Sequence, residues 1–567
     1  MVIHSRWQTP VPDGSLQKWV FDSSFDAIPD TPQYIDPDRP DTHVLTKADY
    51  RLWSKRVALG LQRAGLKPGG RVLLFSGNTL FSPVIFMGIL MAGGIFTGAN
   101  PSFVARELAY QLKDSGAYIL IAADKSMEIA TEAAEQAGIP KSRVYSFDAT
   151  AFDENPGKAR LGVRHWTELL ASKSDAAKFD WVEPEDSKTA TCCLNYSSGT
   201  TGVPKGVEIT HYAYIANGVS IVHVDSQGNE WEDKRRRSRQ LAFLPMYHAY
   251  GQTYFMCNYP KLGVPVYVMP SFDFEKALHH IQKYRITSIM AVPPIIVALG
   301  KNPIVRKYDL SSVETVSSGA APLGQEICDE VAKVWPTGQI IVRQGWGMTE
   351  ITCTGTNWHP DVFLRTSSVG EIATNSKARI MRTDGSEVTV ANERGELWIS
   401  TPTVMKGYWN KPEATADTIH VDPDGTRWLK SGDVAYIERY EPGGYLHIVD
   451  RIKELIKVKG NQVAPAELEA VLLDNSGVTD VAVVGVTING EEMPRAYVVP
   501  NSADRKTERE IAKWMESRVT RYKWLKGGVK FIDAIPKNPS GKILRKHLRD
   551  QAAQEVGDRQ PSASKLA

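Results

Sequence analysis

The sequence predicts an α/β fold with several subdomains, and three observations lead to this prediction. The chain has 567 residues, 42% hydrophobic and 23% charged, which is typical of folded proteins but too long for one compact core. From about residue 70 to 345, short apolar runs alternate with amphipathic stretches, as in parallel β-α units. From 369 to about 449 the pattern becomes β-rich, and a compact α/β run follows to about residue 549.

The predicted elements follow in chain order. Apolar runs predict strands at 72–75, 118–122, 241–244, 264–269, 288–292 and 340–344. Amphipathic spacing predicts helices at 274–283 and 323–334. In the β-rich region, we expect strands to be separated by turn clusters at 395–400, 422–425 and 441–444.

One uncharged stretch could be read as a membrane span. There is no charged residue between Arg71 and Arg106, and 81–99 is largely apolar. Pro83 and several glycines interrupt this segment, whereas a spanning helix needs about 20 predominantly apolar residues. We therefore expect a buried helix with flanking turns.

Charge and cysteine content exclude several classes of partner. Lys and Arg total 67 against 65 for Asp and Glu, so the net charge of +2 gives no reason to expect nucleic acid or an anionic membrane as partner. The five cysteines form no C-x-x-C pair, which argues against a disulfide framework or a zinc site and favours a reducing, intracellular compartment. The basic run 234–237 is predicted to be a solvated loop rather than a targeting signal.

The two ends of the chain carry little predicted structure. No secretory signal is expected at the N-terminus. The tail from 551 to 567 is rich in Gln, Ser and Ala and is predicted to be disordered. The tripeptide Ser564-Lys565-Leu566 matches a peroxisomal address, but such an address is read only at the very end of a chain, and Ala567 follows it here. The prediction is a cytoplasmic protein, or a peroxisomal one if Ala567 is not native.

The sharpest chemical signal is the segment Ser197–Gly206, Ser-Ser-Gly-Thr-Thr-Gly-Val-Pro-Lys-Gly. Small residues allow backbone N–H groups to close on an anion, the hydroxyls donate further hydrogen bonds, and Lys205 adds a positive charge. This composition predicts a phosphate cradle. It is not the P-loop of ATPases, because the glycine spacing differs and Gly206 stands where that motif has Ser or Thr.

Ser197–Gly206 resembles the signature of the acyl-adenylate-forming superfamily, which comprises acyl-CoA ligases, peptide-synthetase adenylation domains and beetle-type luciferases. Later segments resemble further boxes of that family in the same order, and together they cover about residues 50 to 550. These segments are Gln344–Glu350, Gly395–Trp398 with Gly407–Asn410 and Ser431–Asp433, Asp450–Gly460, and Pro539–Arg545. Through Gly460–Glu469 and Ile535–Lys542 the chain most resembles 4-coumarate–CoA ligases and their fungal relatives.

The resemblance implies a domain organisation. A large N-terminal domain, residues 1–449, would combine two β-α subdomains with a β-rich one. Residues 450–453 would form a hinge, and residues 454–550 a small mobile C-terminal α/β domain that acts as a lid. Residues 551–567 would form the disordered tail.

The resemblance also implies an ATP-dependent carboxylic acid–CoA ligase. A carboxylate would attack the ATP α-phosphate to give acyl-AMP and pyrophosphate, and coenzyme A would then displace AMP. The expected cofactors are ATP, Mg²⁺ and coenzyme A, the expected partners are small molecules, and the oligomeric state stays open. A luciferase-like adenylating oxygenase, a P-loop NTPase that forms ADP and a non-catalytic binding protein are the alternatives from other classes.

The family's functional residues carry over onto matching positions of this chain. Nucleotide binding falls on Ser197, Ser198, Gly199, Thr200, Thr201, Gly202, Lys205, Gln344, Gly345, Trp346, Thr349, Asp433, Arg451, Lys453, Lys459 and Gly460. Glu350 is the expected Mg²⁺ ligand. Lys542 is expected to act in adenylation, Lys457 and Gln462 in thioester formation, and His248 to gate the pantetheine channel.

The resemblance also places the pocket for the acid. By family alignment its lining is Tyr250, Tyr254, Gly319, Ala320, Ala321, Cys353 and Thr354. The two tyrosines favour an aromatic or arylalkyl acid, and a medium-chain fatty acid is the alternative. Hydroxycinnamate ligases commonly have a small residue near Tyr254 and Pro-Val near Cys353-Thr354, so 4-coumarate itself is in doubt. No acidic residue lies near Tyr247–Tyr250 to hold an amino group, which disfavours amino acids.

Overall fold

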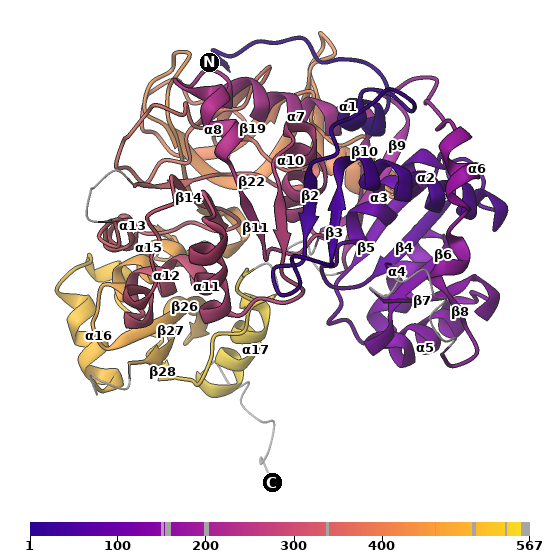
Figure 1. Ribbon diagram of the computed structural model, residues 1–567. Helices are drawn as coiled ribbons and strands as arrows, with labels where there is room; N and C mark the ends of the chain where they lie inside the picture. Colours follow the sequence, from indigo (N-terminus) through magenta and orange to yellow (C-terminus); the bar gives the residue numbers. More distant parts are fainter. Residues whose placement is uncertain are drawn as a thin grey trace.

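The computed structural model of the protein describes residues 1–148, 152, 160–197, 203–335, 340–459, 461–501, 506–538 and 541–556. These residues form three large sheets and a smaller C-terminal α/β part, which Figure 1 shows in yellow below the rest of the molecule. Two of the large sheets are β-α sheets and the third is almost free of helices. The predicted fold class, a large α/β region with a β-rich subdomain and a small C-terminal α/β part, is confirmed.

The first β-α sheet has the strand order β20-β10-β9-β5-β4-β6-β7-β8. The bounds are β4 Arg71–Phe75, β5 Ile95–Ala99, β6 Ala117–Ala123, β7 Val144–Phe147, β8 Arg164–His165, β9 Thr191–Ser197, β10 Lys205–Thr210 and β20 Gly407–Tyr408. Strands β4 to β9 pair in parallel, whereas β10 is antiparallel to both β9 and β20. The connecting helices are α3 (Ser82–Met91), α4 (Ala105–Ser115) and α5 (Met127–Ala137).

The second β-α sheet has the order β15-β14-β13-β11-β12-β2-β3. The bounds are β2 Pro32–Ile35, β3 Val44–Thr46, β11 Gln240–Ala242, β12 Val266–Val268, β13 Ser288–Ala291, β14 Thr315–Ser318 and β15 Val342–Gln344. All pairs are parallel except β2 with β3, so the carboxyl ends of the parallel strands share one edge. The N-terminal strand β2 pairs with β12, far from it in sequence, and Figure 1 shows β2 and β3 on that side of β11. The intervening helices are α11 (Phe274–Tyr284), α12 (Pro293–Lys301) and α13 (Gln325–Ala332).

The third sheet is antiparallel and accounts for the β-rich pattern. Its order is β1-β18-β19-β22-β21, with β23 also paired to β22. The bounds are β1 Ile3–His4, β18 Lys377–Met381, β19 Gly395–Ser400, β21 Ile419–Val421, β22 Arg427–Ile437 and β23 Leu446–Arg451. The expectation of a turn cluster at 395–400 is therefore wrong, because this segment is strand β19. The clusters at 422–425 and 441–444 do connect strands.

The C-terminal part has its own sheet and its own hydrophobic clusters. Strands β26 (Val478–Ile488), β27 (Glu491–Pro500) and β28 (Val529–Phe531) form the sheet, and β24 (Ile456–Val458) pairs with β25 (Asn461–Val463). Helices α15 (Pro465–Leu473), α16 (Glu508–Glu516) and α17 (Arg545–Val556) pack on it. Its two clusters contain only residues from 456 onwards. The limits of the domains and the hinge at 450–453 stay predictions.

Two local expectations need correction. Residues 551–556 belong to helix α17 rather than to a disordered tail, and 557–567, with the tripeptide Ser564–Leu566, lies outside the described residues. The basic run 234–237 is the end of helix α8 (Trp231–Arg237) rather than a loop. Two of its charges pair within the helix, since Arg235 lies 2.8 Å from Glu232 and Arg236 lies 3.6 Å from Asp233, whereas Lys234 and Arg237 pair with Asp361 and Glu314.

The apolar stretch 81–99 contains the buried helix α3, as predicted, but its last part forms strand β5 rather than a flanking turn. All residues of α3 are buried, and the helix packs on α2 (Lys47–Arg63) and β5. A Cβ on Gly88 would lie 2.6 Å from Val57 Cγ1, so glycine is needed for this close approach of two helices. Among the described residues, no helix is long and apolar enough to cross a membrane.

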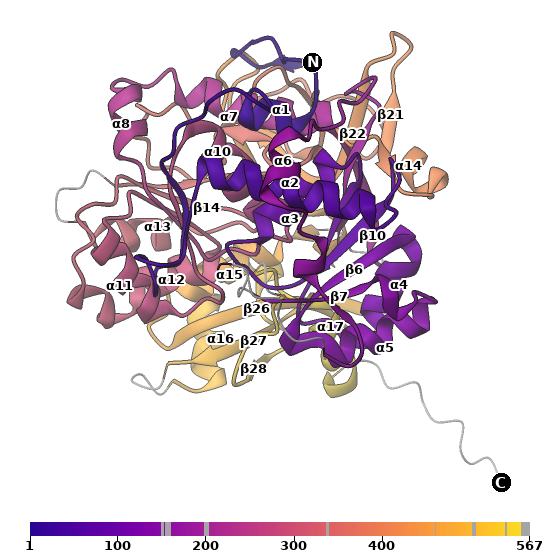
Figure 2. The same ribbon diagram turned by 45° about the vertical axis from the view of Figure 1, so that its right-hand side comes forward.

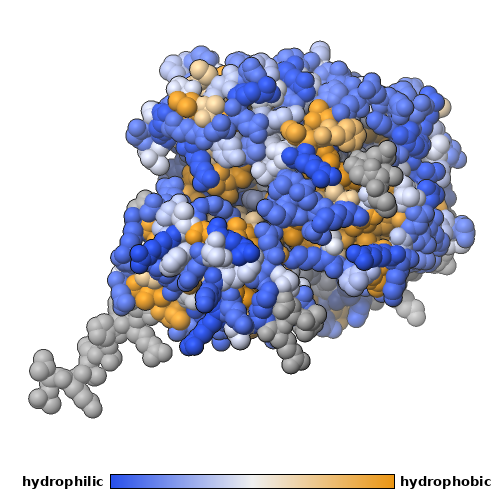
Figure 3. All heavy atoms as spheres, turned by 90° about the vertical axis from the view of Figure 1, so that its left-hand side faces the viewer, coloured by the Kyte–Doolittle hydropathy of each residue, from blue (hydrophilic) through white to orange (hydrophobic). Residues whose placement is uncertain are grey.

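Views from other sides complete the description. Figure 2 shows α2 and α3 above the strands β6 and β7, and the C-terminal helices α16 and α17 below these strands. The face in Figure 3 is largely hydrophilic, with separate hydrophobic patches and a hollow between its upper and lower parts.

Candidate functional site

Lys542 reaches the N-terminal region from a short loop that precedes α17. Asn538 shapes this loop, since its Oδ1 accepts a hydrogen bond from the backbone N–H of Lys542 at 2.9 Å. Gly541 has a φ of 79°, and a Cβ there would lie 2.8 Å from Val292 Cγ2. Glycine therefore allows the loop to adopt this turn while it packs directly on the segment between β13 and α12.

The charges around Lys542 come from separate parts of the chain. Burial, followed by the charge of the nearby Arg451, lowers the pKa of Lys542 to about 8, although Glu350 and Asp433 act in the opposite direction. The site thus holds a lysine beside two carboxylates and an arginine. An anion that entered would stabilise the ammonium form further.

Asp433 lies on β22 beside the strand that carries Arg451. The two residues are direct partners in the β22–β23 ladder, and Arg451 Nε lies 3.6 Å from Asp433 Oδ1. Burial raises the pKa of Asp433, while Arg451 and a hydrogen bond from Trp346 lower it. Trp346 Nε1 donates to Asp433 Oδ2 at 2.8 Å. The carboxylate is therefore held in position from two sides.

The segment after β15 differs from residue to residue in its exposure. The Gln344 side chain is buried and bonds both backbone groups of Leu323 at 2.9 Å, so its amide positions the loop. Gly345 is exposed, and a Cβ there would meet open space. Trp346 is buried, and Thr349 begins the short helix η7 (Thr349–Ile351).

Glu350 is buried and connected to Lys205 through Tyr408. Tyr408 donates its hydroxyl proton to Glu350 Oε1 at 2.9 Å, and Lys205 Nζ lies 4.5 Å from the centre of the Tyr408 ring. Among the described residues there is no group of three or more His, Cys, Asp or Glu that could hold a metal ion. Glu350 alone therefore fits Mg²⁺ only where phosphate oxygens complete the ligand set, as Mg²⁺ with nucleotides commonly has.

The phosphate-loop prediction falls mostly outside the described residues. This applies to Ser198, Gly199, Thr200, Thr201 and Gly202, and also to Gly460. The flanks of the loop are described: Ser197 ends β9, Lys205 begins β10, and the two are direct partners in an antiparallel hairpin. The Ser197 hydroxyl is buried, and no hydrogen bond to another described residue accounts for it.

His248 precedes the turn α9 (Ala249–Gly251) and is neutral. Its Nδ1 accepts from the backbone N–H of Tyr250 at 3.4 Å. Burial lowers the pKa of His248 to about 3, and the charge of Lys542 contributes to the shift. The imidazole is thus uncharged at physiological pH and lies within electrostatic range of Lys542.

The residues predicted for thioester formation lie elsewhere. Lys457 and Gln462 are exposed and face each other as partners in the β24–β25 hairpin. The backbone N–H of Lys457 donates to Glu492, and Lys459 forms an ion pair with Glu491 at 3.2 Å. Lys453 is exposed as well. The structure brings Lys542 to Glu350 and Asp433 but does not bring this second set there.

Most of the predicted acid-pocket residues lie together. The rings of Tyr250 and Tyr254 meet edge to face with centroids 5.5 Å apart, and Tyr254 Oη lies 3.3 Å from Thr354 Oγ1. A Cβ on Gly319 would lie 3.3 Å from the Tyr250 ring. Cys353 is buried next to Thr354, and burial raises its pKa to about 11. The cluster provides an aromatic wall of Tyr250 and Tyr254 beside Gly319, which has no side chain.

The two alanines that follow Gly319 differ from this cluster. Ala320 has a φ of 76°, a left-handed conformation that costs energy for a residue with a Cβ. Ala321 is exposed. We read the strained Ala320 as part of the bend that turns the chain after β14.

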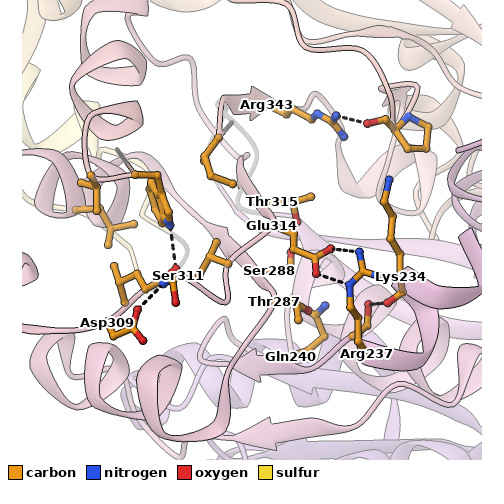
Figure 4. A pocket seen from close by; sticks show the side chains of 18 of the residues that line it. Lys234, Arg237, Gln240, Thr287, Ser288, Asp309, Ser311, Glu314, Thr315 and Arg343 are labelled. Carbon is orange, nitrogen blue, oxygen red and sulfur yellow. Dashed lines mark hydrogen bonds and ion pairs between the residues drawn. The ribbon is translucent and has the colours of Figure 1, made fainter. Parts of the chain in front are cut away.

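A cavity of about 1360 Å³ lies at the opposite ends of the strands and contains none of the predicted site residues. Its lining includes the first residues of β11, β13 and β14, which are Gln240, Ser288 and Thr315. Figure 4 shows the Arg237–Glu314 ion pair in its wall. Several of its charged lining residues are paired within the protein, such as Arg237 with Glu314 and Lys333 with Glu330, so it does not replace the site around Lys542.

Sequence reasoning missed two contributors. Tyr408 lies in the segment Gly407–Asn410, which was matched to a family box, but its contact with Glu350 could not be read from spacing. Asp114 has no motif around it and becomes visible only through its contacts with Tyr196 and Lys411.

Comparison with known proteins assigns the chain to a family. The model of the AMP-binding enzyme family matches residues 21–409, and the model of the AMP-binding enzyme C-terminal domain matches residues 467–542. The chain therefore belongs to the AMP-binding enzyme family, in agreement with the predicted resemblance to the acyl-adenylate-forming superfamily.

Its relatives narrow the class to CoA ligases that resemble 4-coumarate–CoA ligase. The chain is 36% identical over 562 residues to a phenylacetyl-CoA ligase of Aspergillus niger, with 98% of this chain and 100% of the relative covered. It is also 36% identical over 517 residues to 4-coumarate–CoA ligase 2 of Nicotiana tabacum, with 90% of each covered. ATP-bound MatB from Rhodopseudomonas palustris shares the fold, with a TM-score of 0.79 at 24% identity over 95% of this chain and 99% of that chain.

Proposed function

We propose that the protein is an ATP-dependent carboxylic acid–CoA ligase that works through an acyl-adenylate and acts on an aromatic or arylalkyl acid. The observation that supports this most is the position of Lys542 beside Glu350 and Asp433 in a chain that matches both AMP-binding family models. A lysine with a pKa of about 8 among carboxylates is suited to a multiply charged anion such as a triphosphate.

In the first step, a carboxylate oxygen of the acid would attack the α-phosphorus of ATP, and pyrophosphate would leave. Lys542 would lie against the reacting phosphoryl group, where its ammonium offsets the growing negative charge. Asp433 would accept hydrogen bonds from the ribose hydroxyls, while Arg451 and Trp346 hold its carboxylate. Mg²⁺ bound through Glu350 and the phosphates would supply further positive charge.

In the second step, the coenzyme A sulfur would attack the acyl carbonyl carbon, and AMP would leave with the C–O bond broken. This step needs an open approach for a long thiol, which Lys542 and its loop would obstruct. We propose that Lys457 and Gln462, partners on the exposed β24–β25 hairpin, come to the site when the C-terminal part turns about residues 450–453. His248, neutral and near Lys542, would then border the channel.

The acid class follows from the pocket and from the relatives. The edge-to-face pair Tyr250 and Tyr254 and the bare backbone at Gly319 would suit a flat ring. A relative named for phenylacetyl-CoA is 36% identical over nearly the whole chain. A medium-chain fatty acid is the second candidate, because an apolar wall would also accept a chain. The compartment, cytoplasmic or peroxisomal, stays a prediction.

The test measures AMP and pyrophosphate release over a panel of benzoic, phenylacetic, phenylpropanoic, cinnamic and medium-chain fatty acids, with and without coenzyme A. We expect acid-dependent pyrophosphate release without coenzyme A, and AMP release with it. Lys542→Ala should lose adenylation by about 100-fold or more yet keep thioester formation from supplied acyl-AMP. Lys457→Ala should show the converse. ADP formation, or oxygen consumption with light emission, would overturn the proposal.

A further inference from the structure

The contacts at the base of the hairpin that carries the predicted phosphate loop point to a network outside the site already described. The hairpin strands are β9, which ends at Ser197, and β10, which begins at Lys205. Tyr196 lies one residue before Ser197, and Pro204 lies one residue before Lys205. Both of these residues contact the last turns of helix α4, which belongs to a different β-α unit.

Asp114 is the centre of these contacts. The Tyr196 hydroxyl donates to Asp114 Oδ2 at 2.7 Å, and Lys411 Nζ forms an ion pair with Oδ1. The Tyr110 hydroxyl lies 3.0 Å from the carbonyl oxygen of Pro204 and 3.3 Å from Asp114 Oδ1, so its single proton can be donated to either acceptor. Tyr110 and Asp114 lie four residues apart on one face of α4.

The position of Asp114 is difficult to explain by helix stability. An acidic side chain in the last turn of a helix lies at the negative end of the helix dipole, which is unfavourable. The carboxylate is largely buried, with 12% of its side chain exposed, and its shortest contacts come from Tyr196 and Lys411, outside the helix. Its partners Tyr196 and Lys411 lie 82 and 297 residues away in sequence. These contacts indicate that Asp114 holds Tyr196 and Lys411 rather than stabilising helix α4.

Lys411 connects the network to the far side of the loop. It follows β20, whose Tyr408 contacts Lys205 and Glu350. The backbone N–H of Trp409 donates to the carbonyl of Gly206 at 2.8 Å. The Asp114–Lys411 ion pair therefore joins α4 to the segment that borders both Lys205 and Glu350.

We propose that Asp114, with Tyr110 and Tyr196, is a positioning network that holds the two ends of the phosphate loop at the spacing that ATP binding requires. This inference rests on the proposed function, because it takes Ser197–Gly206 as the triphosphate cradle. Asp114 is a positioning residue and touches no reacting atom. Its removal should weaken the affinity for MgATP while the sites for the acid and coenzyme A stay as they are.

The test is the affinity of the full-length protein for MgATP, measured by titration calorimetry, for Asp114→Asn, Tyr196→Phe and Tyr110→Phe. A lost hydrogen bond to a charged group corresponds to roughly a tenfold change in an equilibrium constant, so we expect a Kd for MgATP about tenfold higher in Asp114→Asn. The two Tyr→Phe variants should each raise it about threefold. The KM for the acid, and thioester formation from supplied acyl-AMP, should change less than about twofold.

Two comparisons separate positioning from general loss of structure. Tyr118→Phe on β6 is the matched control, because Tyr118 is not part of the Asp114 network as the structure describes it, and its Kd should equal that of the wild type. Lys411→Arg should keep the ion pair and the affinity, whereas Lys411→Met should behave like Asp114→Asn. If Asp114→Asn does not fold, the test depends on Tyr196→Phe and Tyr110→Phe and on the comparison of Lys411→Arg with Lys411→Met.

The outcomes are distinct for the two proposals. Unchanged MgATP affinity in the folded variants would overturn the positioning network. The proposed ligase function would still stand if the wild type releases AMP in the presence of an acid and coenzyme A. An equal rise in the Kd for MgATP and the KM for the acid would also overturn it, since that pattern is loss of packing. A wild type that releases no AMP with any acid would instead remove the proposed function.

Discussion

At the scale of single residues, the site depends on groups whose properties are set by burial. Lys542 has a pKa of about 8 because of burial and the nearby charge of Arg451, and His248 has one of about 3 because of burial and the charge of Lys542. Asp433 has a raised pKa but remains paired with Arg451 and Trp346. The site therefore combines a cationic lysine, Lys542, with the neutral imidazole of His248 and the carboxylate of Asp433, which is held in place.

The pKa of Lys542 predicts a pH dependence. Burial disfavours the ammonium form, so the lysine is charged below about pH 8 and neutral above it. We expect kcat/KM for ATP in pyrophosphate release to fall as pH rises through about 8, since this quantity reports the free enzyme. Lys542→Arg, which keeps its charge, should lose this alkaline decline although its rate is lower. A wild-type profile that stays flat to pH 9.5 would show that the charge of Lys542 is not required.

At the scale of elements, the sequence predicted the strands and helices of the β-α units because their periodicity is local. Runs such as 72–75 and 118–122 became β4 and β6 with shifts of one residue at their ends. The segment Gly395–Ser400 was misjudged because it begins with glycine, a turn former, although buried and partly buried residues alternate along it as in a strand. The basic run 234–237 ends a helix in which Arg235 and Arg236 pair with acidic residues one turn earlier, a spacing that composition alone does not reveal.

The sequence predicted the site residues that belong to a recognisable motif. It did not predict those whose role depends only on contacts in the folded chain. Lys542, Glu350, Asp433 and Arg451 lie in family boxes, and the structure brings them together. The Asp114 network joins residues up to 297 positions apart, and a pairing of that range has no local signal. The seven-residue π-helix η5 (Gln252–Asn258) also had no signal, since its wider turn depends on what packs around it.

The π-helical η5 places Tyr254, and this leads to a prediction about substrate choice. Tyr254→Ser should open space beside Tyr250 and Thr354, the residues that contact Tyr254. Each added buried CH₂ contributes about 0.8 kcal/mol, so acids longer by two or three carbons should gain roughly ten- to fiftyfold in relative kcat/KM. Tyr254→Phe, which keeps the ring and loses only the hydroxyl, is the control and should keep the wild-type order of acids.

Melting temperature separates this effect from a packing defect. Removal of a buried aromatic ring costs about 3–5 kcal/mol when the site is fully buried, and Tyr254 is only partly buried, so the loss in stability should be smaller. A Tyr254→Ser variant that melts lower but ranks short and long acids as the wild type does would show that Tyr254 packs outside the acid site.

At the scale of the whole molecule, the structure shows one arrangement of the C-terminal part, with Lys542 in the site and Lys457 exposed. Contacts between the two parts stabilise it. Lys301, the last residue of α12, donates to the carbonyl oxygen of Leu473 at 2.6 Å and lies 3.4 Å from that of Val478. Leu473 ends α15, where the helix dipole is negative, so a cation is favoured there.

This contact predicts that Lys301 favours the adenylating arrangement over the one that forms the thioester. Lys301→Met keeps the length of the side chain and removes its charge and donors, which should weaken docking by about 1–2 kcal/mol. We expect pyrophosphate release without coenzyme A to fall about five- to thirtyfold, because fewer molecules hold Lys542 in the site. Thioester formation from supplied acyl-AMP should stay equal or rise, since it uses the other arrangement. Lys307→Met, an exposed lysine six residues further along the chain, is the matched control and should leave both half-reactions unchanged. If Lys301→Met slows the two half-reactions equally, or neither of them, the contact with Leu473 does not select between arrangements.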